Sequence, residues 1–340
     1  MEVPLNFKGE IKLAHGAGGR LSHQLVKNFA RIFDNPLLAP LADAAVFRIG
    51  GQRLAFSTDS HVISPIFFPG GDIGRLAVFG TVNDLAVMGA RPLYLACGLI
   101  IEEGFPFDKL NRIVDSMSWA AQEARIQVIT GDSKVVERGK GDGIFINTTG
   151  IGLIESGADL CPEAIRVGDQ ILLSGTIGDH AAAVLTAREG LRFGGDLISD
   201  CAPLSSMIGK LLKECRGIKW MRDPTRGGLA AVLNELVEGC DFGIELDETA
   251  ILVKPAVRSL CELLGFDPLH LANEGKVVLV VRVEDGEKAL ALLRSHPLGR
   301  NAAIIGKVQD KPAGRVILRT SIGGLRVVDL PAGELLPRIC

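Results

Sequence analysis

The stretch from Ile73 to Gly89 constrains the fold more than any other part of this sequence. It has the length of a helix, is apolar almost all round, and ends at a glycine, the residue type that commonly follows a helix C-terminus. A helix without a polar face is buried on every side, so other elements must pack around it. Asn83 and Asp84 interrupt the apolar run, and a charge inside such a helix is costly unless something pairs with it.

Strands and helices alternate around this helix and form a first unit that ends near residue 155. The Gly50-Gly51 pair joins two short apolar segments and predicts a β-hairpin from Ala45 to Thr58. Asp108 is predicted to cap a helix whose apolar face holds Leu110, Ile113, Val114, Met117 and Ala121. Further strands are predicted at Leu93–Ile101, which we expect to be buried, at Gln127–Thr130 and at Gly143–Gly152. Such alternation indicates an α+β or α/β fold.

The rest of the chain repeats this alternation and predicts a second unit. Predicted strands lie at Gln170–Ser174, Lys276–Val283, Ala303–Ile305 and Val316–Arg319, and predicted helices at His180–Arg188, Thr225–Glu238 and Asp285–Ser295. A chain of 340 residues favours two domains. We expect an N-terminal segment with a glycine-rich loop at 1–40, domains at 41–155 and 156–330, and an extended, mobile tail at 331–340.

Composition excludes several classes of protein. A net charge of −3 and an aromatic content of 5% provide neither attraction for nucleic acid nor a surface for base stacking. The first ten residues lack the apolar core of a signal peptide, and the apolar run at Leu93–Ile101 is too short to span a bilayer. Seven cysteines without a CxxC pair argue against a disulfide framework or a zinc site. We therefore expect a reducing, cytoplasmic location without membrane or nucleic-acid partners.

Four aspartates occupy apolar or glycine-rich settings near the ends of predicted elements: Asp43, Asp59, Asp84 and Asp132. Each of them alone is most simply a turn residue or a helix cap. Together in one cleft they would suit Mg²⁺, a hard ion that prefers oxygen ligands and usually accompanies a nucleotide phosphate.

Two glycine-rich segments are candidate anion sites. In His15-Gly-Ala-Gly-Gly-Arg20, glycines would let backbone N–H groups approach a phosphate. Asp223-Pro-Thr-Arg-Gly-Gly228 precedes a predicted helix, whose N-terminus attracts anions. The alternative for this second segment is an ordinary capping loop with Thr225 as the cap. Neither segment matches the two common nucleotide-binding signatures, GxGxxG and GxxxxGK[ST].

Two further side chains have open alternatives. Lys134 is a phosphate ligand, a proton-transfer group, or a solvated lysine in a charged run. Glu274 directly precedes a predicted buried strand and is either a base or a turn residue. The histidines at 15, 61, 180 and 270 are scattered, a pattern more typical of structural roles.

The chain ends in a cysteine, Cys340. A terminal residue is accessible to other proteins, and a thiolate is a strong nucleophile, so this residue can carry a covalently bound group. The alternative is an inert, solvated thiol.

Long motifs resemble a known superfamily. The segment from Asp59 to Gly74 (DSHVISPIFFPGGDIG) and that from Gly80 to Pro92 (GTVNDLAVMGARP) resemble the ATP-using aminoimidazole ribonucleotide synthetase (PurM-like) superfamily. Within it, Gly131-Asp-Ser-Lys-Val-Val-Glu137, Arg222-Asp-Pro-Thr-Arg-Gly-Gly228 and the ending Pro337-Arg-Ile-Cys340 resemble the HypE family of hydrogenase maturation proteins. The resemblance covers nearly the whole chain.

The resemblance implies an α+β, PurM-like two-domain fold. Its N-terminal domain would form a shared β-barrel on dimerisation, with ATP near the interface, and its C-terminal α/β domain would close over the site. Carried onto this sequence, it implies ATP-binding residues at His15, Gly16, Gly18, Gly19, Thr58, Asn83, Gly131, Asp223, Thr225, Arg226 and Gly227. It implies Mg²⁺ ligands at Asp43, Asp59, Asp84 and Asp132. Many relatives carry paired acids where Leu41-Ala-Asp-Ala-Ala45 offers only Asp43.

The implied activity is an ATP-dependent dehydration on Cys340. A HypF-type carbamoyltransferase would load a carbamoyl group onto sulfur, and phosphorylation of the carboxamide oxygen followed by loss of phosphate would leave a thiocyanate. The cyanide would pass, through a HypC–HypD-type complex, to the iron of [NiFe]-hydrogenase. Glu274 is the first candidate base and Lys134 the second, because a neutral lysine needs a strongly lowered pKa. The alternatives are a small-molecule kinase or synthetase of the same superfamily, such as a thiamine-monophosphate kinase, and a non-catalytic carrier.

Overall fold

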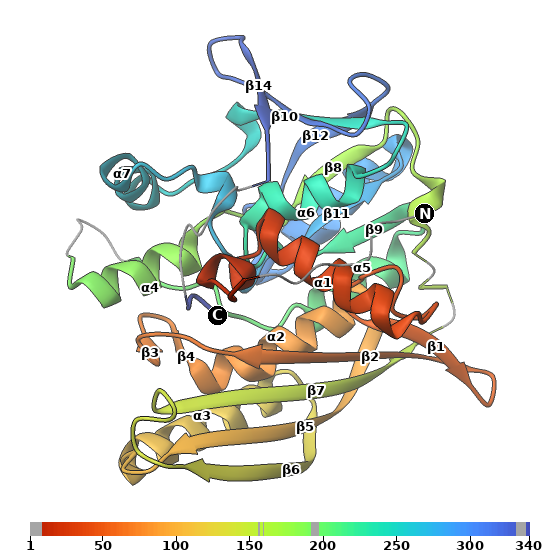
Figure 1. Ribbon diagram of the computed structural model, residues 1–340. Helices are drawn as coiled ribbons and strands as arrows, with labels where there is room; N and C mark the ends of the chain where they lie inside the picture. The colour runs from red at the N-terminus through yellow and green to blue at the C-terminus, as the bar shows by residue number, and fades with distance from the viewer. Residues whose placement is uncertain (1–8, 156, 159, 192–196, 331–337) are drawn as a thin grey trace.

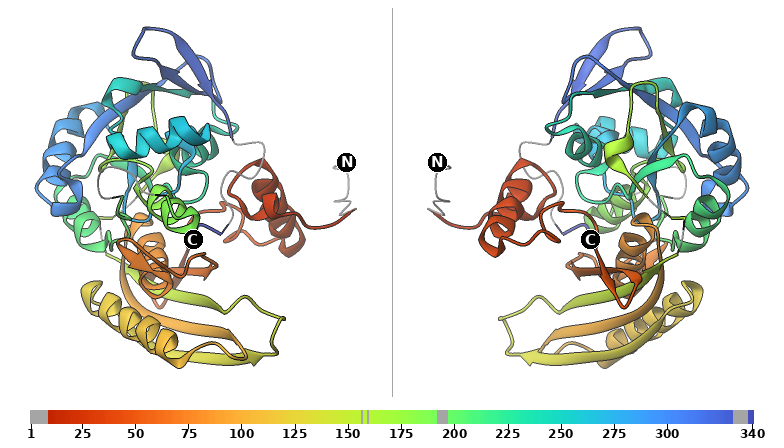
Figure 2. Two further views of the ribbon diagram at one scale, coloured as in Figure 1. Left: turned by 90° about the vertical axis from the view of Figure 1, so that its left-hand side faces the viewer. Right: turned by 90° about the vertical axis from the view of Figure 1, so that its right-hand side faces the viewer.

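The computed structural model describes residues 9–155, 157–158, 160–191, 197–330 and 338–340. Two β-sheets, each with its own helices, lie one above the other in Figure 1, and the C-terminus lies between them. The side views in Figure 2 show the same arrangement, with the N-terminal helix projecting from one side of the molecule. The predicted tail at 331–337 lies outside the described residues.

The lower sheet has five strands. Their order is β1 (Ala45–Ile49), β2 (Gln52–His61), β7 (Ile144–Ile154), β5 (Ala90–Glu102) and β6 (Gln127–Val136). Only the β5–β6 pair is parallel. The predicted hairpin is confirmed, with Gly50 and Gly51 at positive φ in the turn between β1 and β2. A two-residue turn of this kind needs positive φ at both positions, which glycine adopts without strain.

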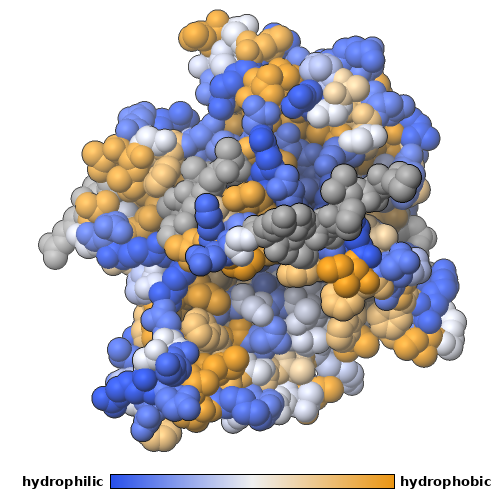
Figure 3. Space-filling model, in the orientation of Figure 1, coloured by the Kyte–Doolittle hydropathy of each residue, from blue (hydrophilic) through white to orange (hydrophobic). Residues whose placement is uncertain are grey.

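Among the described residues, helices cover one face of this sheet and leave the other without a helix. These helices are α2 (Ile73–Val87) and α3 (Phe107–Glu123), which lie behind the strands of the sheet in the view of Figure 1. The prediction that Leu93–Ile101 is a buried strand is wrong in part, because alternate residues of β5 point to the uncovered face, where Tyr94 and Ile100 are more than 40% exposed. Figure 3 shows pale, orange and blue side chains mixed over the lower part of the molecule.

The amphipathic helix differs in two details from its prediction. α3 begins at Phe107 after Pro106, and Asp108 lies in its first turn without capping it. Ile113, Met117 and Ala121 are buried as predicted, whereas Val114 is 46% exposed. Pro106 starts the helix because its fixed φ suits the residues at a helix N-terminus.

The upper sheet has seven strands. Their order is β14 (Leu325–Val328), β13 (Val316–Arg319), β10 (Gly243–Asp247), β12 (Ala303–Gln309), β8 (Gln170–Leu173), β11 (Val278–Val281) and β9 (Ile218–Arg222). Its helices are α4 (Asp179–Glu189), α5 (Ser205–Glu214), α6 (Gly228–Val237), α7 (Pro255–Leu264) and α8 (Gly286–Arg294). Short 3-10 turns lie at Leu13–Gly16, Pro162–Ala164, Glu248–Ala250, Pro268–His270, Val283–Asp285 and Pro297–Gly299.

Helix α2 joins the two halves of the molecule. Most of its residues are buried, in agreement with its apolar sequence, and they contribute to the hydrophobic clusters of both halves. Asp72 caps its N-terminus by accepting hydrogen bonds from the N–H groups of Gly74 and Arg75. A helix buried on all sides between two layers fixes the position of any polar residue along it.

Two smaller elements complete the fold. The N-terminal helix α1 (Arg20–Phe33) follows the glycine-rich loop and is tied to the upper half by His23 and Lys27, which both contact Glu238. The short strands β3 (Phe67–Phe68) and β4 (Gly71–Asp72) form a small hairpin before α2. Among the described residues, no helix combines the length and apolar character needed to cross a membrane.

Candidate active site

Three carboxylates meet where the two halves of the molecule join. Asp43 precedes β1, Asp84 lies on α2 and Asp223 follows β9. One oxygen of each lies within 4.8 Å of the others. Residues 43 and 84 are therefore brought together as the sequence predicted, and Asp223, predicted as an ATP-binding residue, joins them.

Asp84 is held by a hydroxyl of the adjacent strand. The Ser57 Oγ lies 2.7 Å from Asp84 Oδ2 and 2.9 Å from the Asp43 carbonyl oxygen. Burial, and then the charges of Asp223 and Asp59, raise the pKa of Asp84 well above its ordinary value. A hydroxyl has a single proton, so both contacts are satisfied at once when a protonated Asp84 donates to Ser57 and Ser57 donates to the carbonyl.

Asp223 is likewise buried beside other acids. Burial, and then the charge of Asp43, raise its pKa to about 8. The neighbouring Arg222 is already engaged, since it donates to Asp43 Oδ1 at 2.8 Å and to Glu235 Oε2 at 2.8 Å. One guanidinium thus serves two acids and leaves the cluster short of positive charge, which is the condition that a divalent cation relieves.

Asp59 lies beside this cluster. Its Oδ2 is 3.6 Å from Nε2 of the buried His61, and its charge raises the pKa of both Asp84 and Asp223. Strand alternation accounts for this placement, because Ser57, Asp59 and His61 occupy every second position of β2 and face α2.

The two glycine-rich segments meet at their backbones. A Cβ on Gly18 would lie 2.6 Å from the carbonyl carbon of Arg226, and one on Gly227 would lie 2.7 Å from the carbonyl oxygen of Gly18. The first segment is folded by Ser22, which donates to the His15 carbonyl at 2.8 Å and accepts from the Gly18 N–H at 3.0 Å. Gly16 ends the 3-10 turn and Gly19 immediately precedes α1.

The capping alternative for the second segment is wrong. Gly227, at φ +79°, is the residue that precedes α6, and Thr225 lies two positions earlier. Thr225 instead closes a turn, because its carbonyl accepts from the Gly228 N–H at 2.9 Å. The N-terminus of a buried helix therefore opens toward the first glycine-rich segment, and such a terminus favours anions.

The last three residues of the chain are docked against this site. The carbonyl of Cys340 accepts from the Val62 N–H at 3.1 Å, and Ile339 is buried in the hydrophobic cluster around α2. Burial raises the pKa of the Cys340 thiol, opposed by Arg226 and reinforced by Glu274, Asp59 and Asp223. The alternative of a fully solvated thiol does not hold, because Cys340 is only partly exposed and these four charged groups act on its sulfur.

Glu274 is a buried acid with unused hydrogen-bonding capacity. It is 4% exposed, and its Oε1 has no partner within the part of the chain that the structure describes. Burial, and then Asp223, raise its pKa well above the ordinary value. Its backbone is fixed by Asp200, which accepts from the Glu274 N–H at 3.2 Å and pairs with Lys276 at 2.9 Å.

The single chain does not bring Asp132 and Lys134 to this cluster. They lie on the edge strand β6, where Lys134 donates to both oxygens of Asp132 and lowers the pKa of that carboxyl. The register pairs Asp132 with Gly98, Gly98 with Asn147 and Asn147 with Ser60. Three strand spacings of ~4.8 Å separate Asp132 from Ser60 by about 14 Å. Sequence reasoning located the strand but not its place at the edge.

Two predicted ATP-binding residues are also placed elsewhere in the single chain, and a third, Asn83, lies beside Asp84. Gly131 lies on β6 beside Asp132, and Thr58 points to the uncovered face of the sheet, where it contacts Thr149 at 2.9 Å. Asn83 bridges the two halves of the molecule. Its amide donates to the carbonyls of Ala202 and Glu274 and accepts from the Leu204 N–H at 2.8 Å. Its side chain is thus a structural bridge.

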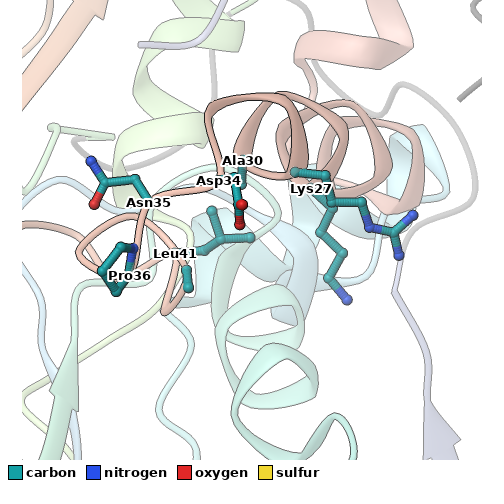
Figure 4. A pocket seen from close by; sticks show the side chains of 8 residues that line it. Lys27, Ala30, Asp34, Asn35, Pro36 and Leu41 are labelled. Carbon is teal, nitrogen blue, oxygen red and sulfur yellow. The ribbon is translucent and has the colours of Figure 1, made fainter. Parts of the chain in front are cut away.

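A hollow near α1 is separate from these groups. Its volume is 460 Å³, and residues of α1 and of the following loop line it, as Figure 4 shows: Lys27, Ala30, Arg31, Asp34, Asn35, Pro36, Ala39 and Leu41. None of the clustered acids, glycines or the terminal cysteine belongs to this lining. The hollow therefore is not the candidate active site.

Sequence reasoning missed the residues that hold the chain end. His180 and Arg188, both on α4, contact the carbonyls of Ile339 and Arg338. From the sequence, His180 is one of several scattered histidines, a pattern that indicates structural roles. The only local signal was a histidine in an alanine-rich buried helix, and the contact partner lies 159 positions away in sequence.

Family models describe most of the chain. Residues 41–154 match the AIR synthase related protein, N-terminal domain, and residues 166–319 match the AIR synthase related protein, C-terminal domain. Both sheets described above fall within these matches, apart from β14.

Whole proteins and solved structures are similar over nearly the full length. Carbamoyl dehydratase HypE of Cupriavidus necator is 51% identical, covering 99% of this chain and 97% of that protein. A HypE structure from a HypE–HypF complex has a TM-score of 0.86 at 48% identity, covering 92% of this chain and 100% of the other. A HypE structure in complex with ATP has a TM-score of 0.82 at 49% identity, covering 97% of this chain and 100% of the other.

Similarity at this level, over nearly the full length of both chains, extends well beyond a shared fold. The chain belongs to the carbamoyl dehydratase HypE family, within the AIR synthase related proteins.

Proposed function

We propose that this protein dehydrates a carbamoyl group carried on the sulfur of its own Cys340, at the expense of ATP, to give a thiocyanate. The observation that carries this proposal is the docked chain end. The Cys340 thiol shares a site with Arg226, Glu274 and the acids around Asp223. A thiol on which the charges of Arg226, Glu274 and Asp223 act is suitably placed to be the substrate of a site formed by these groups.

The clustered acids fit a magnesium ion. Asp43, Asp84 and Asp223 offer oxygens within 4.8 Å of one another, close enough to share one ion, and burial, followed by the charges of neighbouring acids, raises the pKa of Asp84 and of Asp223. Asp59 lies beside them as a further oxygen donor. When bound, the ion supplies positive charge for the phosphates of ATP and lowers the repulsion among these acids.

The paired glycine-rich segments are the proposed phosphate site. Gly18 and Gly227 allow the two segments to meet at their backbones, beside the N-terminus of α6, and His15, Gly16, Gly19, Thr225 and Arg226 belong to the same two segments. A HypE structure in complex with ATP supports this proposal. The charges of Arg226 and of the Cys340 sulfur interact, and the guanidinium would stabilise charge on the oxygen that accepts the phosphoryl group.

The proposed chemistry balances in two steps. The carboxamide oxygen of S-carbamoyl-Cys340 attacks the γ-phosphorus, and the bond to the ADP oxygen breaks. The C–O bond then breaks, phosphate leaves with the former carbamoyl oxygen, and the two N–H protons depart as the C≡N bond forms. Phosphorylation matters because it converts a poor leaving group into a good one.

Glu274 is the proposed base for these protons. Its Oε1 is buried and unpartnered among the described residues, so it is available to a group on the nearby sulfur. A raised pKa makes a carboxylate a stronger base, provided that it is ionised when it acts. The charge of Asp223 contributes to the raised pKa of Glu274. Neutralisation of Asp223 would therefore favour the ionised form of Glu274.

We propose that two kinds of partner serve this site. A HypF-type carbamoyltransferase would load Cys340, a step supported by the solved HypE–HypF complex. A HypC–HypD-type iron-carrying complex would then accept the cyanide for [NiFe]-hydrogenase. A free terminal thiol requires a reducing compartment such as the cytoplasm, and all seven cysteines, which lie within the described residues, are unpaired.

We further propose a homodimer built on the lower sheet, as a shared β-barrel. The nine residues from Gln127 to Val135 of the edge strand are all exposed, and one face of the sheet is uncovered. Pairing there would remove an exposed edge. It would also give Asp132 and Lys134 of the partner subunit a route to the active site that the single chain does not provide, and Gly131 and Thr58 lie on the same surface.

Two alternatives make different use of the chain end. A small-molecule kinase of the same superfamily would not need Cys340, yet this residue lies within the site where its substrate would bind. A non-catalytic carrier would not need the acidic cluster or Glu274. The proposed division into segments at 1–40, 41–155, 156–330 and 331–340 assigns the acceptor cysteine to the last of these.

Intact-mass analysis tests the proposal. The protein is incubated with a HypF-type carbamoyltransferase and carbamoyl phosphate, and ATP with Mg²⁺ is then added. We expect the gain of one carbamoyl group followed by the loss of one water, and no gain for Cys340→Ala. Equal loading of Cys340→Ala would exclude the terminal cysteine, and a carbamoyl adduct that persists with ATP would leave only the carrier function.

A further inference from the structure

The docked chain end is held through its backbone. The carbonyl of Ile339 accepts a hydrogen bond of 2.7 Å from His180 Nε2, and the carbonyl of Arg338 accepts one of 2.7 Å from Arg188. Both donors lie on α4, two turns apart along one helix. Neither of them is among the clustered acids or the glycine-rich segments, so the site described above leaves their role unexplained.

A chain of hydrogen bonds sets the tautomer of His180. The Cys201 N–H donates to Ser199 Oγ at 3.1 Å, so the Ser199 hydroxyl can donate its proton to His180 Nδ1 at 2.8 Å. The Nε2 atom then carries the hydrogen and donates it to Ile339. Burial lowers the pKa of His180, although the hydrogen bond to Ile339 acts in the opposite direction. The lowered pKa keeps the ring neutral at pH 7, in the form whose Nε2 is the donor.

The ring itself is fixed in place. His180 is fully buried, and its ring packs against that of Phe68 in a T-shaped arrangement, with a centroid distance of 5.3 Å and perpendicular ring planes. A buried donor that has lost its acceptor leaves an unsatisfied polar group, which is costly. The pocket formed by α4 and the β3–β4 hairpin therefore favours the state in which the Ile339 carbonyl is present.

Arg188 clamps the chain end to the lower half of the molecule. Its Nε donates to the Ser64 carbonyl at 2.8 Å while its Nη2 donates to the Arg338 carbonyl. The Ser64 N–H in turn donates to the same Arg338 carbonyl at 3.3 Å. One guanidinium thus ties the segment after β2 and the chain end to α4.

We propose that His180, oriented by Ser199, and Arg188 form a grip that positions Cys340 for dehydration by binding the backbone carbonyls of Ile339 and Arg338. Both are positioning residues, since they contact the chain end and not the reacting atoms. The grip binds backbone carbonyls and not the cysteine side chain, so it acts on Cys340 with or without a carbamoyl group. It sets how much of the time Cys340 is in the active site and how much it is available to a loading partner.

The role in dehydration rests on the proposed function, whereas the grip itself can be measured without it. The probe is iodoacetamide, and the readout is the rate of Cys340 alkylation in the metal-free, full-length protein, followed by peptide mass spectrometry. Arg188→Met and His180→Leu each remove a donor to the chain end. We expect alkylation to become about tenfold faster, the change that losing one strong hydrogen bond produces in a docking equilibrium.

Matched variants separate the grip from general effects on folding. His180→Gln keeps an N–H donor near the Nε2 position and should stay close to the wild-type rate. Arg258→Met removes an arginine from the exposed side of α7 and should also have no effect. If His180→Leu does not fold, the alkylation rate of Arg188→Met alone tests the grip. The Arg188 side chain is only partly buried, so we expect this variant to fold. Wild-type alkylation rates in both folded donor variants, even with lowered thermal stability, would overturn the grip.

A second measurement links the grip to the reaction. With the carbamoyltransferase, carbamoyl phosphate and ATP, Arg188→Met should load at least as fast as wild type but lose water more slowly in a single turnover. Unchanged dehydration would overturn the positioning role. If the wild-type adduct itself never loses water, the proposed function fails, while the alkylation rates still report on the grip.

Discussion

A Cβ placed on Gly227 would lie 2.7 Å from the carbonyl oxygen of Gly18. These two residues are 209 positions apart, yet their backbones touch where the N-terminal loop meets the start of α6. Gly227 also has a φ of +79°, a conformation that residues with a Cβ rarely adopt. The proposed phosphate site thus depends on two separate properties of one glycine, its conformation and its lack of a side chain.

The first prediction separates these two properties. Gly227→Ala should destabilise the protein by about 1 kcal/mol through its positive φ and by a further ~1–3 kcal/mol through the contact with Gly18. Because the Gly18 backbone must move, ATP binding should weaken as well. Urea unfolding and nucleotide-binding titrations measure the two effects.

Gly139→Ala is the matched control for that substitution. Gly139 has the same φ of +79°, but a Cβ there would meet no atom within 4 Å. It should therefore show only the conformational cost and normal ATP binding. Equal effects of the two substitutions would mean that the contact between the loops is unimportant.

Local patterns in the sequence predicted much of this fold. The buried helix at 73–87 follows from its uniform apolar character, and the hairpin follows from the glycine pair between β1 and β2. Both glycine-rich segments were recognised separately. Their contact was not predictable, because no periodicity relates position 18 to position 227.

The errors have a common physical cause. Thr58 and Asp59 are adjacent in sequence but point to opposite faces of β2, and only the order of the strands tells which face adjoins α2. Asp132 follows the same type of strand pattern as Asp59, yet its strand lies at the far edge of the sheet. Strand order is a long-range property, so side chains whose role depends on it were predicted least well.

The second prediction concerns the acidic cluster and pH. In the metal-free protein the pKa of Asp223 is about 8, so at pH 7 this carboxyl is mostly protonated. Binding of Mg²⁺ needs the ionised form and should therefore release protons. The proton on Asp223 alone makes the affinity rise by up to about tenfold per pH unit below pH 8, and its effect levels off above pH 8; a proton released by Asp84, whose pKa is also raised, adds to this dependence.

The same shift affects folding stability with a defined sign. A folded-state pKa of about 8, above the ordinary 3.8, means that the folded protein holds a proton that the unfolded chain has lost. This contribution is fully present below about pH 4 and is lost as the pH rises through 8. Magnesium should consequently stabilise the protein most above pH 8. Calorimetry in two buffers and unfolding curves with and without the ion test both points.

Asp223→Asn should remove the proton that residue 223 releases and weaken Mg²⁺ binding, leaving only the proton released by Asp84. Asp241→Asn, an exposed aspartate outside the cluster, provides the control and should behave as wild type. Normal magnesium affinity in Asp223→Asn would remove Asp223 from the proposed metal site.

The third prediction tests whether Lys134 acts on the neighbouring subunit. Lys134 and Asp132 form an exposed pair on β6, remote from Asp84 in the same chain. If each active site combines its own Asp84 with the partner's Lys134, a mixture of inactive Asp84→Asn and Lys134→Ala chains should regain about a quarter of wild-type activity, because half of the dimers are mixed and each has one intact site.

Absence of any recovery would have a specific meaning, provided that the chains exchange. Every site would then contain one defect, as expected if Lys134 serves its own chain. Native mass spectrometry of chains with different isotope labels establishes the exchange independently. A fully active Lys134→Ala protein would exclude the lysine from the reaction altogether.

The fourth prediction concerns the base. Glu274 has a buried oxygen without a partner among the described residues, and its backbone is fixed by Asp200. Glu274→Gln keeps the size of the side chain but cannot accept a proton, so the carbamoyl adduct should accumulate and dehydration should slow by about 100-fold or more. Carbamoyl loading, which does not need this base, should proceed normally. Glu262→Gln, an exposed glutamate on α7, should change neither step. A normal yield of thiocyanate from Glu274→Gln would show that another group removes the protons, with the partner's Lys134 then the next candidate.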